Sequence, residues 1–110
     1  MMRMQMSPAA AALLRALALR SGVERNRILL TNVHSTDWQS LTFTGERHQL
    51  SLRITGDDSG DVAERMCDGL EECEFTISGV VVADIAVVGT RRRASDGATE
   101  LVIEALTIAD

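Results

Sequence analysis

The side chains of this sequence that could do chemistry are few and scattered. His48 falls on the apolar face of an alternating segment, and Asp84 interrupts the apolar run VVVADIAVV. A histidine can act as a ligand or a base near neutral pH, and a buried carboxylate with a raised pKa suits acid–base work. If the two side chains converge, they predict a small-molecule site or a small enzyme. If His48 is instead satisfied by a backbone group and Asp84 faces water, both residues are structural.

The other histidine, His34, precedes Ser35, Thr36 and Asp37. A catalytic triad is assembled in space from a nucleophile, a base within hydrogen-bond reach and an oxyanion hole, so adjacency in sequence does not indicate one. These three residues are common in turns because their side chains bond to nearby backbone groups. We therefore interpret residues 34–37 as a turn and predict no catalytic residue there.

The cysteines and the acidic loop do not match metal-binding motifs. Cys67 and Cys73 are not spaced as C-x-x-C and have no neighbouring histidine, so two free thiols are the expectation. The string DDSGD at residues 57–61 lacks both the DxDxDG spacing and the glutamate at position twelve of a calcium loop. Glycine-rich phosphate motifs are absent. The sequence predicts no metal and no cofactor.

A short run of arginines, Arg91, Arg92 and Arg93, could grip a phosphate or a carboxylate-rich partner. The alternative is the solvated tip of a hairpin loop at residues 90–98. The formal net charge of −5 is the opposite of the balance typical of nucleic-acid-binding domains. We therefore expect no nucleic-acid partner.

The elements that must position these residues are clearest between residues 37 and 56. Residues 38–44 and 47–55 alternate with period two, which is typical of strands with one buried face. Gly45 and Glu46 between them predict a two-residue hairpin turn, because glycine reaches positive φ without steric cost. This register buries Leu41 and Phe43. The opposite, polar face is the candidate partner surface, and it carries a cross-strand pair of Trp38 and Arg53 together with Arg47, Gln49 and Ser51.

The other elements follow from caps and periodicity. Ser7, Pro8 and Gly22 bound a helix that ends at residue 20 or 21, with an apolar stripe that excludes Leu19. A second helix is predicted at about residues 59–68, and further strands at 27–33, 75–88 and 101–108. The predicted fold is α+β in the order α-β-β-β-α-β-β. Two helices pack on one face of an antiparallel sheet of about five strands.

The 110 residues suffice for one domain, which we assign to residues 7–110 after a disordered tail at residues 1–6. The apolar N-terminal run is interrupted by Arg15, so helix signals explain it better than a signal peptide does. The longest apolar run, residues 80–88, is too short to span a bilayer. The expectation is a cytoplasmic protein with no membrane partner.

The order of elements, the small size and the acidic pI of about 4.9 are similar to those of type III secretion chaperones. The sequence lacks the final helix that is usual in that family. The resemblance implies a homodimer that binds secreted proteins.

Two functional hypotheses follow. The first is a non-enzymatic protein-binding or assembly module that acts as a homodimer, because the later strands are apolar on both faces and the first helix is rich in Ala and Leu. The alternative is a small-molecule-binding domain or small enzyme, with a pocket between helices and sheet that uses His48 and Asp84.

Overall fold

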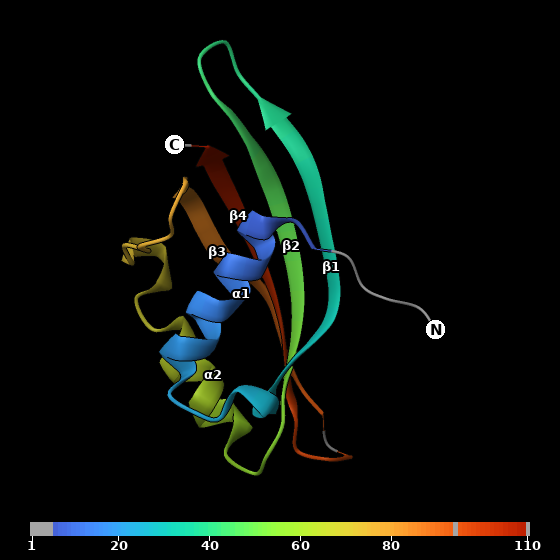
Figure 1. Ribbon diagram of the computed structural model, residues 1–110. Helices are drawn as coiled ribbons and strands as arrows, with labels where there is room; N and C mark the ends of the chain where they lie inside the picture. The colour runs from blue at the N-terminus through green and yellow to red at the C-terminus, as the bar shows by residue number, and fades with distance from the viewer. Residues whose placement is uncertain (1–5, 94, 110) are drawn as a thin grey trace.

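Two helices cover one face of a four-stranded antiparallel sheet in the computed structural model (Figure 1). The structure describes residues 6–93 and 95–109, so the predicted disordered tail lies outside the described residues except for Met6. The predicted fold class is confirmed: α+β, with helices on an antiparallel sheet. The observed order is α-β-β-α-β-β, one strand fewer than expected.

Helix α1 (Pro8–Ser21) begins and ends where the sequence predicts. The Ser7 hydroxyl accepts a hydrogen bond from the Ala10 N–H at 3.2 Å, and Gly22 ends the helix with a φ of 72°. Leu19 is 82% exposed, as predicted for a residue off the apolar stripe. The buried side of the helix consists of Ala10, Leu13, Leu14, Leu17, Ala18 and Ser21.

The first hairpin corrects the predicted one. A short 3-10 turn, η1 (Arg25–Arg27), leads into β1 (Ile28–Gln39), which runs straight through the residues predicted to form a turn at 34–37. β1 pairs with β2 (Thr44–Ile54) along its whole length, so this ladder outweighs the turn preference of Ser35 and Asp37. The predicted strands 27–33 and 38–44 are therefore parts of one longer strand and of the turn after it.

The chain reverses at residues 40–43 and not at Gly45 and Glu46, which lie inside β2. Leu41 and Phe43, predicted to be buried, are exposed at the tip of the hairpin. Trp38 lies opposite Gly45, so the predicted Trp38–Arg53 pair is wrong. The alternation that suggests a buried strand at residues 38–44 also fits the end of a strand and its turn.

Gly45 has a different role from the one predicted. A Cβ at this position would lie 2.0 Å from the carbonyl oxygen of Thr107 and 3.0 Å from the Cα of Ile108 in the neighbouring strand. Its φ is not positive. The glycine therefore permits the close approach of two strands, which is a recognised use of glycine within a sheet.

The second half of the chain repeats the helix-then-hairpin pattern. Helix α2 (Ser59–Cys67) is followed by a 3-10 turn, η2 (Leu70–Glu72), and then by β3 (Val80–Arg92) and β4 (Thr99–Ala109). β3 starts and ends later than predicted, so Arg91 and Arg92 belong to a strand and not to a loop. β4 pairs with both β2 and β3, which gives the order β1-β2-β4-β3.

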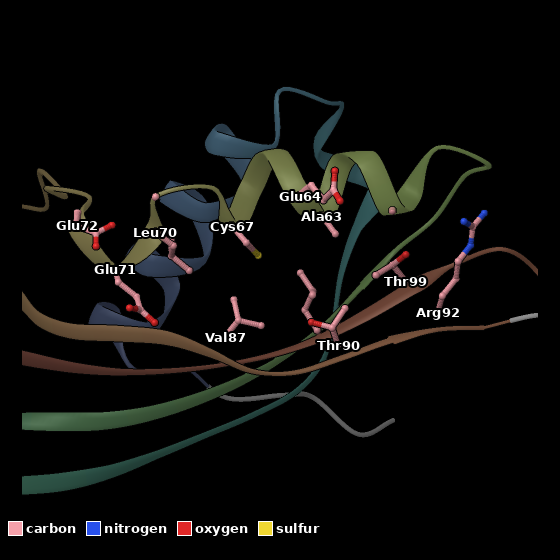
Figure 2. A pocket seen from close by; sticks show the side chains of 13 residues that line it. Ala63, Glu64, Cys67, Leu70, Glu71, Glu72, Val87, Thr90, Arg92 and Thr99 are labelled. Atoms are coloured by element: carbon pink, nitrogen blue, oxygen red, sulfur yellow. The ribbon is translucent and has the colours of Figure 1, made fainter.

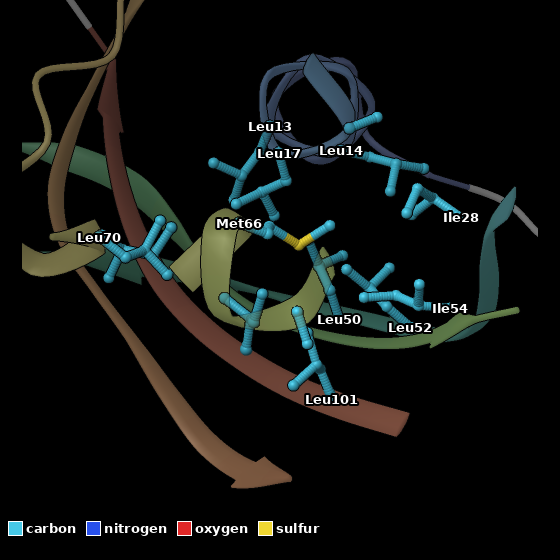
Figure 3. Packing of buried hydrophobic residues seen from close by; sticks show 14 of the residues in the cluster. Leu13, Leu14, Leu17, Ile28, Leu50, Leu52, Ile54, Met66, Leu70 and Leu101 are labelled. Carbon is cyan, nitrogen blue, oxygen red and sulfur yellow. The ribbon is translucent and has the colours of Figure 1, made fainter. Parts of the chain in front are cut away.

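The core lies between the helices and one face of the sheet (Figure 3). Met66 of α2 sits beneath Leu13 and Leu17 of α1 and above the leucines of β2 in this view. Complete burial of such side chains contributes about 1.5–3 kcal/mol each. The cluster combines both helices with all four strands and includes Leu13, Leu14, Leu17, Ile28, Leu50, Leu52, Ile54, Val62, Met66, Ile85, Leu101 and Ile103.

Candidate functional site

The sheet face that turns away from the helices, called the open face below, carries most of the predicted site residues. Successive side chains of a strand point to opposite faces, so the residues before and after a buried residue point to the open face. Figure 1 shows α1 and α2 on the other side of the sheet. No described helix covers the open face in residues 6–93 and 95–109.

The β1–β2 half of the open face is polar. Register places Arg47 opposite Thr36, Gln49 opposite His34, and Arg53 opposite Leu29. The Gln49 amide donates to Glu104 Oε2 at 3.2 Å, which links this half to β4. Trp38, Arg47, Gln49, Ser51 and Arg53 thus share one face, although the predicted pairing among them is wrong.

Arg53 is held at the edge of this face by an ion pair with Asp96. The Ala98 backbone N–H, which donates to Asp96, and the Arg53 and Arg93 guanidinium groups lower the pKa of the Asp96 carboxyl. Both partners of the Arg53–Asp96 pair are substantially exposed, so it contributes little to stability.

The β4–β3 half of the open face carries most of its apolar side chains, together with the charged Asp84, Arg91, Glu100 and Glu104. Val81, near the start of β3, and Val88, farther along it, are 50% and 52% exposed. The other apolar side chains on this face are partly buried, because they contact one another and the side chains of adjacent strands. We call this set the apolar strip: Val81, Ala86 and Val88 of β3, with Val102, Leu106 and Ile108 of β4.

A shallow hollow of about 350 Å³ lies in the middle of the open face. Arg47 and His34 line it from the β1–β2 half, whereas Asp84 and Glu104 line it from the other half. The face therefore carries opposite charges on its two halves, beside an apolar strip. Such a surface can bind a second protein surface more readily than it can hold a small molecule.

His48 lies on the opposite, helix-facing side and is 2% exposed. Its Nδ1 lies 2.7 Å from the Ser35 hydroxyl, and its Nε2 lies 2.8 Å from the Thr107 hydroxyl. Thr107 donates onward to the Glu46 carbonyl at 3.5 Å, which fits a chain in which Ser35 donates to Nδ1 and Nε2–H donates to Thr107. Burial lowers the pKa of His48, and the Glu46 carboxylate partly opposes this effect.

A serine and a histidine at hydrogen-bond distance are the first two members of a nucleophilic triad. Here the second ring nitrogen of His48 is occupied by Thr107, and the ring is buried. The arrangement satisfies a buried histidine with two hydroxyl groups. It differs from the predicted backbone partner and supports a structural role.

Asp84 and His48 both border the hollow of the open face, but their side chains point to opposite sides of the sheet. Asp84 is exposed and pairs with Leu106, next to the buried Ile85. A register shift between Val82 and Asp84 turns its side chain to the open face, whereas the His48 ring faces the helices. The two side chains are also separated by the intervening strand β4.

The three arginines are likewise separated. Arg91 pairs with Glu100 on the open face, and Arg92 pairs with Thr99 on the helix-facing side. Arg93 follows the strand, and its guanidinium lies 3.6 Å from the Glu100 carboxylate. These positions provide no single patch for a phosphate.

The helix-facing side has a groove of about 630 Å³ between α2, η2 and β3, called the α2–β3 groove below (Figure 2). In Figure 2, Glu71 and Glu72 lie at one end and Arg92 at the other, with Val87 and Thr90 between them. The remaining lining residues are Gly60, Ala63, Glu64, Cys67, Gly69, Leu70, Thr99 and Leu101.

Cys67 lines the groove, whereas Cys73 lies beside it without contributing to the lining. Both are free thiols and partly buried, and burial raises the pKa of Cys67. Arg20 of α1 reaches this region: it donates to the Met66 carbonyl at 3.0 Å, to the Asp68 carbonyl, and to Cys73 Sγ at 3.1 Å. One side chain thus joins α1 to the end of α2 and to the chain beyond it.

The sequence predicted a pocket between helices and sheet with His48 and Asp84 as its polar groups, but not the residues that line this groove. Its one sequence signal is the acidic run EECE at residues 71–74, two residues after Gly69, the residue that precedes η2. That run gives no indication that it lies over β3, because this contact depends on how the chain folds back between η2 and β3. The hydroxyl partners of His48 were missed for the same reason, since they depend on the register.

Comparison with known proteins places this chain in no family. Neither a scan against protein-family models nor a search of curated proteins finds a match. In the described residues, no helix has the length and apolar character needed to cross a membrane. Residues 6–93 and 95–109 contain no group of three or more His, Cys, Asp or Glu side chains placed to hold a metal ion.

Proposed function

We propose that this protein is a non-enzymatic protein-binding and assembly module that acts as a homodimer through the open face of its sheet. The supporting observation is the apolar strip. Sheets in two-layer domains bury one face against helices and usually expose a polar second face. Here one half of the second face carries the apolar strip, and Val81 and Val88 are about half exposed.

The size of the open face is adequate for association. Four strands of about eleven residues, spaced about 4.8 Å apart with a rise of about 3.3 Å per residue, cover about 700 Å². A stable interface buries about 800 Å² on each partner. The open face alone therefore approaches the required area, and the flanking side chains of Trp38 and Arg53 extend it.

The charges of the open face are self-complementary. Arg47 lies on the β1–β2 half, and Asp84 and Glu104 lie on the β4–β3 half. A two-fold axis parallel to the strands and centred over β4 places the apolar residues of β4 against their own copies and Arg47 of each copy near Asp84 of the other. Such an isologous contact closes at two subunits.

The test is size-exclusion chromatography with light scattering at micromolar concentration. The wild-type chain is expected as a dimer, and the double variant Val81→Lys/Val88→Lys as a monomer. Both valines are already half exposed, so their replacement leaves the core intact. The control is Leu41→Lys/Phe43→Lys, which changes two exposed apolar residues at the hairpin tip and is expected to remain a dimer.

A monomeric wild-type chain contradicts the homodimer. Dissociation by the hairpin-tip control, with the open-face variant still dimeric, contradicts the assignment of the interface. Circular dichroism of each variant verifies that the fold persists.

The likeness to secretion chaperones and the alternative small-molecule site carry less weight than the apolar strip. The likeness to secretion chaperones rests on the order α-β-β-β-α-β-β, which differs from the order observed. The alternative enzyme or small-molecule site requires His48 and Asp84 in one pocket between helices and sheet. The α2–β3 groove occupies that position, but neither residue lines it. Both residues border the hollow of the open face, which is not between helices and sheet.

A further inference from the structure

The α2–β3 groove has the form of a peptide-binding site. Its volume of about 630 Å³ lies in the range of ligand pockets. Ala63, Leu70, Val87 and Leu101 provide an apolar floor between a helix and an outer strand. The groove is open along one side, so it suits a segment of chain that lies along it.

The charges at its two ends differ in sign. Glu71 and Glu72 of η2 are exposed at one end, with Glu64 on the rim above. At the other end Arg92 makes a single described hydrogen bond, to the Asp57 carbonyl at 3.4 Å. Three carboxylates against one guanidinium give the groove a negative balance, as does the net charge of −5 for the chain. A basic ligand is therefore attracted at a distance as well as in contact.

The length of the groove limits the segment. Val87 and Arg92 lie on the same side of β3 at opposite ends of the apolar floor, and this stretch spans about 16 Å at about 3.3 Å per residue. About five residues of an extended chain fit this length.

We propose that the α2–β3 groove binds a short, extended segment of a partner protein, with basic residues at the Glu71–Glu72 end, apolar residues in the middle and a carboxylate at Arg92. The groove is on the helix-facing side, so this binding is separate from association through the open face.

The probe is a fluorescein-labelled peptide, Lys-Lys-Val-Leu-Val-Glu, compared by fluorescence polarisation with its charge-reversed form Glu-Glu-Val-Leu-Val-Lys. The basic peptide is expected to bind saturably, at least tenfold more tightly than the reversed peptide. Its affinity should fall at high salt, because exposed ion pairs are screened. Equal affinity of the two peptides, or no saturable binding, overturns the proposal.

Matched variants locate the site. Thr90→Trp fills the groove and is expected to weaken binding at least tenfold, whereas Arg91→Trp places the same ring on the open face and is expected to change affinity less than twofold. Glu71→Gln/Glu72→Gln should weaken binding, and Glu74→Gln, which is outside the lining, should not.

Cysteine alkylation gives a readout that does not depend on affinity. Bound peptide is expected to slow the alkylation of Cys67, which lines the groove, and to leave the rate at Cys73 unchanged. Equal protection of the two thiols contradicts binding in this groove. A Thr90→Trp variant that alters the oligomeric state without altering peptide affinity also contradicts peptide binding in this groove. In that case the groove belongs to a contact between two copies of the chain.

Failure of the peptide-binding proposal can be distinguished from failure of the homodimer proposal. Val81→Lys/Val88→Lys changes only the open face, so it is expected to bind the basic peptide as the wild-type chain does. Loss of peptide binding in this variant, with its fold intact, contradicts the separation of the two surfaces.

Discussion

The buried His48 predicts that the fold loses stability in mild acid. Burial lowers the pKa of this ring below its ordinary value of 6.5, so the unfolded chain binds the proton more readily than the folded chain does. The free energy of unfolding therefore falls as the pH drops through about 6.5, and it levels off below the lowered pKa of the folded state. Because one proton is involved, the slope cannot exceed about 1.4 kcal/mol per pH unit.

Protonation also rearranges the hydrogen-bonded chain around the ring. In the neutral form Ser35 donates to Nδ1, but an imidazolium nitrogen can only donate, so the Ser35 hydroxyl must turn to accept. Thr107 already accepts from Nε2 and needs no change. Both hydroxyl groups can still pair with the ring, so the cost of protonation is mainly desolvation and not a lost hydrogen bond.

Urea unfolding between pH 7.5 and pH 5, at fixed protein concentration, measures this effect. Trp38 is the only tryptophan and reports on the β1–β2 hairpin by fluorescence. Asp58 and Asp96 have pKa values lowered below 3.8, chiefly by bonds from Arg27 and from the Ala98 N–H, so their contributions are lost only at lower pH.

Two variants separate His48 from other causes. His48→Gln is expected to remove the fall in stability between pH 7.5 and pH 5, although it costs stability at both pH values. His34→Gln changes the exposed histidine of the open face and is expected to retain the fall. A flat wild-type profile, or a fall that persists in His48→Gln, refutes the reasoning.

Two further predictions test the packing. The buried Ser59 hydroxyl donates to the Gly97 carbonyl at 2.5 Å and lies 2.8 Å from the Thr99 hydroxyl, so Ser59→Ala should lower the free energy of unfolding by about 1–3 kcal/mol. In urea unfolding, Ser59→Ala/Thr99→Val should cost less than the sum of the single changes; strict additivity contradicts the bond. Leu17→Ala should cost about 2–5 kcal/mol, whereas Leu19→Ala should change stability by less than about 0.5 kcal/mol. Equal shifts in thermal unfolding of these two variants contradict the orientation of α1.

Local signals were sufficient for the helices and insufficient for the first hairpin. Ser7, Pro8 and Gly22 act within one or two turns of their own positions, so α1 could be read from the sequence with both ends correct. Gly45 has two possible uses in a sheet, a turn or a close approach between strands. The choice between them depends on Thr107, which comes much later in the sequence.

The candidate surfaces divide in the same way. Period-two alternation predicts that Arg47, Gln49 and Arg53 share one face, since this requires only that the strand exists. Whether that face is covered, and whether η2 lies over β3, depends on how elements pack in space. The sequence therefore indicated residues of the open face and the apolar character of the later strands, but neither the apolar strip as one surface nor the lining of the α2–β3 groove.

The central position of β4 has a consequence for biosynthesis. β4 pairs Thr99 with Ile54 and Ile108 with Gly45, contacts that join residues on the order of 50 positions apart, so the sheet closes late. A ribosome adds about 5–20 residues per second, so the β1–β2 hairpin emerges seconds before the strand that completes its second edge. During that interval the leucines of β2 have only β1 and the helices as partners. The newly made chain is then a candidate for chaperone capture, and a lesion that removes β4 leaves β3 without a place in the sheet.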